Sequence, residues 1–429
     1  MKGEKKMKKH QIKITLTSIF LLLAMIFNIC GCNADNKNEI KAKDLTVGVK
    51  PSEISVSGDF SSDNSRITDF AVRLFKASES KGNNTLISPL SVLCALAMTA
   101  NGAKEETLEQ VERVLGLPID KLNQYIHNYL KNLPQSEKYK LSLANSIWFT
   151  DDDRFTVNND FLQTNTDYYG ANIFKAPFNE ATKNDINNWV NEKTDEMISE
   201  ILDDISPDAV MYLVNALAFE AEWMEIYEEN QIREGKFTKE DGTEQNATFM
   251  NGSESIYLED ENATGFMKKY KDGKYAFVAL LPNEGVSVSE YIGSINGETL
   301  NSLLENPKYT TVKTSIPKFE TEYSVEMSAI LSSMGMPDAF NPENANFEGL
   351  GTSTSGNIFI SRVIHKTFIS VGERGTKAGA ATAFEMMDFG MAETDKPKQV
   401  YLNRPFVYMI VDCENNIPFF IGTMMDIEK

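Results

Sequence analysis

The segment "VGERGTKAGAATAFEMMDFGMAETDKPKQV", Val371 to Val400, decides the fold of this chain. Its alanines favour a helix, but Gly375, Gly379 and the absence of a 3.6-residue apolar repeat argue against one. With a period of two, one set of positions is uncharged and begins with small residues, while the other set carries the charges. The uncharged set is Thr376, Ala378, Ala380, Thr382, Phe384 and Met386. This alternation predicts a strand with one buried side and one solvent-facing side.

The residues just ahead of this segment already have the composition of a strand. "NIFISRVIHKTFISVGE" is rich in Ile, Val and Phe, and Gly372 and Gly375 follow it as conformationally permissive positions. We therefore expect the alternating segment to be a strand held outside a sheet, able to turn back beside the strand that leads into it.

The rest of the chain alternates between helical and extended patterns. "SRITDFAVRLFKAS" has one apolar helical face, and "SPLSVLCALAMTANGA" is apolar on most sides, which indicates a buried helix. "DAVMYLVNALAFEAEW" and "YAFVALLPN" are typical of strands. No linker or repeat interrupts residues 65–429, so we expect one mixed α/β (α+β) domain there. Residues 33–64 are polar and lack apolar periodicity, which predicts a flexible tether.

The first 32 residues have the organisation of a targeting sequence. A basic stretch, "MKGEKKMKKHQIK", precedes the apolar run "ITLTSIFLLLAMIFNI", as in a signal peptide. Gly31 directly before Cys32 resembles the lipobox of bacterial lipoproteins, which implies that Cys32 carries a lipid anchor. The mature protein is expected to be secreted and held at the cell surface. Plain secretion and an uncleaved membrane anchor are the alternatives.

Composition and motifs narrow the function classes. The formal net charge is −20, and the residues after Cys32 include 36 basic and 61 acidic ones, which disfavours nucleic acid as a partner. The catalytic and metal-binding motifs of common enzymes are missing, and only His127 and His365 remain after Cys32. We expect no enzyme activity, no metal and no cofactor.

Cys94 and Cys413 lie in apolar settings that favour free buried thiols over a disulfide.

Five segments together resemble one protein family. "GERGTKAGAATA" is similar to the hinge of the serpins, and "VYLNRPFVYMI" resembles their C-terminal signature. "NTLISPLSVLCALAMTANGA", "YLVNALAFEAEW" and "SIPKFETEYSVEMSAILSSMGMPDAFNPENANFEGL" resemble three further serpin segments in the family's order. The chain is identified on these residues as a member of the serpins over residues 65–429. The resemblance implies three β-sheets, about eight or nine helices and an exposed reactive-centre loop at about residues 373–399.

The resemblance also implies a mechanism. A protease attacks the loop, forms an acyl-enzyme and is trapped when the cut loop inserts into the main sheet; serpins are a known example of such strand addition and strain release. Positions that face inward during insertion have to be small and uncharged. Lys377 stands where the family usually has Glu, on the solvent-facing side. The hinge residues carried over by the motif are Glu373, Gly375, Thr376, Ala378, Ala380, Ala381 and Thr382.

Other positions carry over from the matching segments. Trp223 corresponds to the aromatic residue at the end of the sheet where insertion begins, and Ala221 stands where the family commonly has Gly. The residues expected to form hydrogen bonds beneath the opening sheet are Ser88, Ser91, Asn215 and His365.

The bond offered to the protease follows from counting along the loop. The family's cleaved bond lies about seventeen residues from the hinge Glu, which from Glu373 gives Phe389-Gly390 and favours chymotrypsin-like proteases. Met386-Met387 and Met387-Asp388 are alternatives that favour elastase-like or subtilisin-like enzymes, and counting back from "NRPF" gives a position near Thr394.

The expected partners are extracellular serine proteases, and the resemblance also admits cysteine proteases. We expect a monomer that contacts the membrane only through its lipid. The alternative function is a non-inhibitory serpin that acts as a binding or carrier module.

Overall fold

The computed structural model describes residues 40–54, 56, 60–133, 139–153, 155–354, 356–376 and 396–428. Residues from Lys41 onward form one compact unit. The described residues of this unit contain nine α-helices. They are α2 (Asn64–Ser78), α3 (Pro89–Ala100), α4 (Glu105–Leu115), α5 (Ile119–Lys131), α6 (Asn159–Tyr169), α7 (Glu180–Lys193), α8 (Val288–Ser294), α9 (Gly297–Glu305) and α10 (Ser328–Met334).

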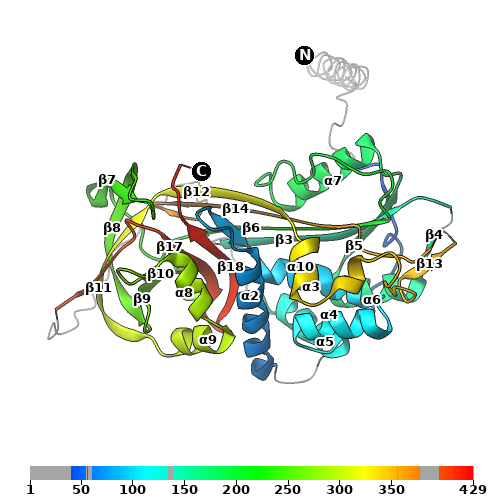
Figure 1. Ribbon diagram of the computed structural model, residues 1–429, viewed down its shortest axis with the longest axis horizontal. Coiled ribbons are helices and arrows are strands. Elements are labelled where there is room, and N and C mark those ends of the chain that lie inside the picture. Colours follow the sequence, from blue (N-terminus) through cyan, green and yellow to red (C-terminus); the bar gives the residue numbers. More distant parts are fainter. Residues whose placement is uncertain are drawn as a thin grey trace, which may run out of the picture. The chain divides into compact units, whose positions relative to one another are not determined.

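The main sheet has seven strands and carries the candidate site. Its order is β1-β5-β3-β6-β15-β14-β12, and β6 also pairs directly with β14. The strands are β1 (Lys43–Asp44), β3 (Tyr139–Thr150), β5 (Asn172–Ala176), β6 (Met211–Glu222), β12 (Phe319–Glu326), β14 (Arg362–Gly372) and β15 (Gly375–Thr376). Figure 1 shows the long strands β3, β6, β14 and β12 running beside one another across the molecule.

A second sheet has nine strands, with β7 attached to β8 beside the path β16-β11-β8-β9-β10-β17-β18-β2. These are β2 (Thr85–Ile87), β7 (Ile232–Thr238), β8 (Glu244–Glu259), β9 (Ala263–Lys269), β10 (Tyr275–Pro282), β11 (Lys308–Pro317), β16 (Lys398–Tyr401), β17 (Phe406–Asp412) and β18 (Ile417–Met424). A third sheet pairs β4 (Phe155–Val157) with β13 (Gly351–Ser353). The predicted mixed α/β fold with three sheets and eight or nine helices is confirmed for the described residues.

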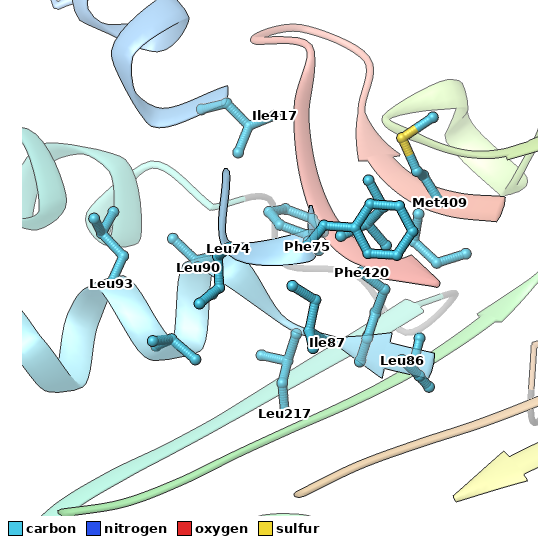
Figure 2. Close-up of a cluster of buried hydrophobic side chains, with 14 of the residues drawn as sticks. Leu74, Phe75, Leu86, Ile87, Leu90, Leu93, Leu217, Met409, Ile417 and Phe420 are labelled. Carbon is cyan, nitrogen blue, oxygen red and sulfur yellow. The ribbon is translucent and has the colours of Figure 1, made fainter. Parts of the chain in front are cut away.

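Helix α3 is buried on every side, as predicted from a sequence that is apolar on most sides. Ser88 caps its N-terminus by accepting a hydrogen bond from the Ser91 N–H, and Pro89 occupies the first helical position, where its missing N–H costs nothing. The helix contacts β3 and β6 of the main sheet and β18 of the second sheet. In Figure 2, Leu90 and Leu93 lie in one apolar cluster with Leu217 of β6. The helix therefore lies against the main sheet at the level of β3 and β6.

The structure differs from the expectation of a flexible tether at residues 41–54. Strand β1 pairs with β5 at the edge of the main sheet, and the backbone N–H groups of Lys41 and Ala42 both donate to Asp185 of α7. The Ser52 N–H donates to Asp167 of α6. Apolar periodicity could not reveal this contact, because backbone groups of a polar segment meet an open strand edge and two carboxylates.

Across the residues that the structure describes, no helix has the length and apolarity that a membrane crossing would require.

Candidate functional site

Strands β6 and β14 pair with each other and then separate. They run parallel over seven residue pairs, from Tyr212 opposite Arg362 to Ala218 opposite Phe368. Beyond Ala218, strand β15 lies between them and is antiparallel to both, with Thr376 opposite Ala221 on one side and Val371 on the other. The main sheet is therefore closed along one stretch and is opened at one end by two residues, Gly375 and Thr376.

A buried hydrogen-bonded cluster lies at the closed stretch. The Ser88 backbone N–H donates to His365 Nε2 at 3.0 Å, so Nε2 is the acceptor and the other ring nitrogen carries the proton. That nitrogen, Nδ1, donates to Asn215 Oδ1. Burial lowers the pKa of His365 to about 3, so the ring is neutral at physiological pH. His365 and Asn215 are opposite each other on β14 and β6, so this bond joins the two strands.

The same asparagine connects the sheet to helix α3. The Ser91 hydroxyl is 3.3 Å from Asn215 Oδ1 and 3.2 Å from the Asn145 Oδ1 of β3. Asn215 Nδ2 is buried and has no hydrogen-bond partner among the described residues. A buried amide without a partner is costly, so this N–H group is a donor available to any strand that separates β6 from β14. The structure thus brings together Ser88, Ser91, Asn215 and His365 in one cluster.

Trp223 lies at the open end, directly after β6. Its backbone N–H donates to the Arg374 carbonyl at 2.8 Å, and its indole Nε1 donates to the Gly372 carbonyl at 2.8 Å. Gly372 is the last residue of β14, and Arg374 lies in the turn that leads from β14 into β15. Trp223 therefore holds that turn at the point where the two main strands part.

The hinge residues that the structure describes occupy this opening. Gly375 has φ +151°, and a Cβ atom on it would lie 2.0 Å from the Ala221 carbonyl oxygen, so only glycine fits. The Glu373 carboxylate is 2.7 Å from Lys318 Nζ, and hydrogen bonding to Lys318 lowers the Glu373 pKa. Thr376 is fully buried. The remaining expected hinge positions, Ala378, Ala380, Ala381 and Thr382, lie outside the described residues.

Sequence reasoning missed a buried charged group beside the opening. Lys268 of β9 is 2.9 Å from Glu254 of β8, lies 4.5 Å from the Tyr227 ring centroid and donates to the Glu225 carbonyl. Burial raises the pKa of Glu254 although Lys268 opposes that effect. The signal in the sequence was that Phe266, Lys268 and Tyr270 share one side of an apolar strand.

Several expected sites cannot be placed. Cys32 and the candidate cleavage positions Met386, Met387, Asp388, Phe389 and Gly390 lie outside the described residues.

Cys94 and Cys413 are free thiols, and burial raises the pKa of Cys94 to about 12 and that of Cys413 to about 11. Within the described ranges, no group of His, Cys, Asp and Glu could hold a metal ion.

Comparison with known proteins agrees with this geometry. A family model described as "Serpin (serine protease inhibitor)" matches residues 65–427. The chain belongs to the serpin family. An uncharacterized serpin-like protein of Thermococcus kodakarensis is 29% identical over 369 residues, covering 84% of this serpin and 84% of the relative.

Solved structures confirm the serpin fold. The native state of tengpin, a thermophilic serpin, is 48% identical, superposes with a TM-score of 0.86, and the match covers 90% of this chain and 100% of tengpin. Tengpin in its latent state gives a TM-score of 0.76 at 47% identity, covering 88% of this chain and 100% of that structure. The described residues of this serpin are therefore closer in arrangement to the native state of tengpin.

Proposed function

We propose that this serpin inhibits serine proteases by offering its loop for cleavage and then inserting the cut strand between β6 and β14. The observation that supports this is the position of β15, which already lies between the two strands and is antiparallel to both. A strand that continued beyond Thr376 would have to replace the parallel pairing of β6 and β14.

The register of β15 indicates where each inserted residue would lie. Because Thr376 is opposite Ala221 and Val371, continuing the antiparallel register brings Thr382 opposite Asn215 and His365. The Thr382 hydroxyl would then arrive beside the asparagine amide that has no partner in the closed sheet. The position of the buried hydrogen-bonded cluster is consistent with an inserted strand of this length and register.

Side-chain alternation supports the same mechanism. Thr376 points to the buried side, so Ala378, Ala380 and Thr382 would follow it there, since successive side chains of a strand point to opposite faces. These residues are small and uncharged, and Lys377 would face the other side. A buried charge would carry a large desolvation cost, and the sequence avoids one.

The energy and the displacement are adequate for trapping. A new central strand forms ladder hydrogen bonds with both neighbours, while the pairing of β6 with β14 is lost, so the net gain is about one ladder. At about 0.5–1.5 kcal/mol per bond, about ten residues contribute on the order of 5–15 kcal/mol. At about 3.3 Å per residue, an acyl group on Phe389 would lie about 40 Å along the sheet from Thr376. Distortion of the attached protease would then disrupt the oxyanion site needed to hydrolyse the ester.

The test is incubation of the protein with chymotrypsin, elastase, subtilisin and trypsin. We expect a covalent complex that survives denaturing electrophoresis, with chymotrypsin the most reactive, and release of a C-terminal peptide that begins at Gly390. Cleavage without a complex, together with an unchanged melting temperature, would instead indicate a non-inhibitory serpin. An increase in melting temperature after cleavage is the expected sign of insertion.

We also propose that Cys32 anchors the protein at the cell surface through a lipid, on the basis of the lipobox resemblance. Expression of the full chain in a bacterium should give a protein that partitions into detergent. The Cys32→Ser variant should move to the aqueous phase, while Cys30→Ser should not. Equal partitioning of both variants and the natural protein would contradict lipidation.

A further inference from the structure

The Tyr270 side chain contacts Thr376, the second of the two β15 residues that lie between β6 and β14. Tyr270 follows β9 and is fully buried, with its ring stacked on Trp223 at 4.4 Å and 12° and edge-on to Phe219 at 5.2 Å. Its hydroxyl is 2.5 Å from Thr376 Oγ1. Among the described residues, neither hydroxyl has another hydrogen-bond partner.

The ring position is set independently of the loop. The Tyr270 backbone N–H donates to the Tyr275 carbonyl at 2.9 Å, and the Tyr270 carbonyl accepts from the Gly273 N–H at 2.9 Å. Trp223 and Tyr270 also form an isolated β-bridge. Because the backbone on both sides of the ring is held by Gly273 and Tyr275, which lie outside the hinge, the hydroxyl offers a positioned partner to a loop residue.

Thr376 is the loop residue that forms a hydrogen bond with the Tyr270 hydroxyl. A shift of the loop by one residue would turn Thr376 to the other side of the sheet and bring Lys377 to the buried side. Burying the Lys377 ammonium group would carry a desolvation cost, and the Tyr270 hydroxyl would lose its bond. The correct register thus pairs two buried hydroxyls, and the shifted register leaves buried polar groups unpaired.

We propose that Tyr270 is a positioning residue that sets the register in which the loop enters the main sheet. Thr376 already has the neighbours that full insertion would give it, so the bond exists before and after insertion. Tyr270 therefore affects how often insertion starts correctly, and leaves the final gain in stability almost unchanged. This consequence for inhibition rests on the proposed function, whereas the resting contact does not.

The deciding experiment measures amide hydrogen exchange of the hinge in the intact, uncleaved protein. We expect Tyr270→Phe and Thr376→Val each to increase exchange of the peptide around Gly375 and Thr376 about tenfold, because each leaves a buried hydroxyl unpaired. The double variant should show a smaller effect than the product of the two single effects, since it removes both hydroxyls. Thr376→Ser keeps a hydroxyl and should stay within about threefold of the natural protein.

Tyr275→Phe is the matched control. The Tyr275 hydroxyl is also buried but has no partner among the described residues, and its ring contacts the same Phe219 at 5.5 Å. This variant should exchange like the natural protein. If Tyr270→Phe and Tyr275→Phe behave alike, or if the single effects multiply without coupling, Tyr270 does not set the register.

A second measurement connects the contact to inhibition. Tyr270→Phe should raise the number of inhibitor molecules cleaved per chymotrypsin molecule trapped, with Tyr275→Phe unchanged and the melting temperature of the cleaved form unchanged in both. Absence of any complex in the natural protein would refute the proposed function, while the exchange result would still decide whether Tyr270 positions the hinge. Faster exchange with an unchanged ratio of cleaved to trapped molecules would refute the effect on insertion.

Discussion

Lys318 and Glu373 join two distant parts of the chain, with 2.7 Å between the ammonium nitrogen and the carboxylate. Lys318 lies between β11 and β12, and its backbone N–H donates to the Thr248 carbonyl of β8. Glu373 lies in the turn before β15, and its own carbonyl accepts from the Tyr227 N–H. The turn that starts the loop is thereby tied to both large sheets.

This ion pair predicts a pH dependence. The Glu373 pKa is lower in the folded state than its usual value of 4.5, so its stabilisation is present above that value and is lost as pH falls through the lowered pKa. Glu373→Gln should reduce stability at pH 7 by less than about 1 kcal/mol, because both groups are partly exposed. Urea unfolding at pH 7 and at pH 3 checks this, and the difference from the natural protein should be smaller at pH 3.

Glu320→Gln is the control for that experiment, since Glu320 is an exposed carboxylate on the adjacent strand β12. It should leave stability unchanged at both pH values. An equal loss in the two variants at pH 7 would show that net charge, and not the contact with Lys318, is responsible.

His365 predicts a second pH dependence of the same sign for a different reason. Its folded pKa is about 3, whereas an unfolded histidine titrates near 6.5, so below pH 6.5 the unfolded state binds a proton that the folded state excludes. Stability should therefore fall as pH decreases from 6.5 towards 3, by up to about 1.4 kcal/mol per pH unit. Unfolding midpoints measured across this range should depend less steeply on pH in the His365→Asn variant than in the natural protein.

The same substitution, made in turn at two neighbouring loop residues, distinguishes a position expected to face inward from one expected to face outward. Ala380→Arg would place a charge on the side that becomes buried, and Ala381→Arg would place it on the exposed side. We expect Ala380→Arg to be cleaved without trapping chymotrypsin, with its complex yield reduced at least tenfold, and Ala381→Arg to keep most of the natural yield. Electrophoresis under denaturing conditions measures both. Similar yields in the two variants would contradict insertion in the proposed register.

The bond offered to the protease can be identified by changing its specificity. Phe389→Arg should abolish the complex with chymotrypsin and create one with trypsin, because trypsin's pocket takes a basic residue at that position. The complex with chymotrypsin would persist if the bond is Met386-Met387 or Met387-Asp388. Mass spectrometry of the released peptide distinguishes these bonds directly.

The sequence was most informative where one strand pattern determined several properties. Alternation from Thr376 onward predicted a buried side, and Thr376 is buried in the structure. The resemblance to the serpins implied that Ser88 and Ser91 lie near Asn215 and His365, and the structure places the four residues in one cluster. The buried side of Thr376 follows from the period of a regular strand, whereas the grouping of the four cluster residues follows from the resemblance to the serpins.

Contacts between separate elements could not be predicted in this way. Tyr270 and Lys268 belong to β9 and its continuation, and nothing in their local pattern indicates that the hinge and Trp223 lie beside them. The contact of residues 41–54 with β5, α6 and α7 was missed for a related reason, since backbone groups and carboxylates form it without an apolar pattern. Tertiary geometry decides which of many polar residues meet.

Strand β15 occupies only one end of the boundary between β6 and β14, so insertion as proposed would proceed from that end in chain order. The Asn215–His365 bond lies in the middle of the seven paired positions, six residues after Thr376, so an entering strand would meet it about halfway along the pairing of β6 with β14. A molecule arrested before this point would still have this bond intact, while the pairs between it and Ala218–Phe368 would already be replaced by pairs with the loop. In such a partly inserted intermediate, amide protons would be protected from exchange up to a definite residue of the loop. The position of that residue would show how far insertion had gone when a protease escaped or was trapped.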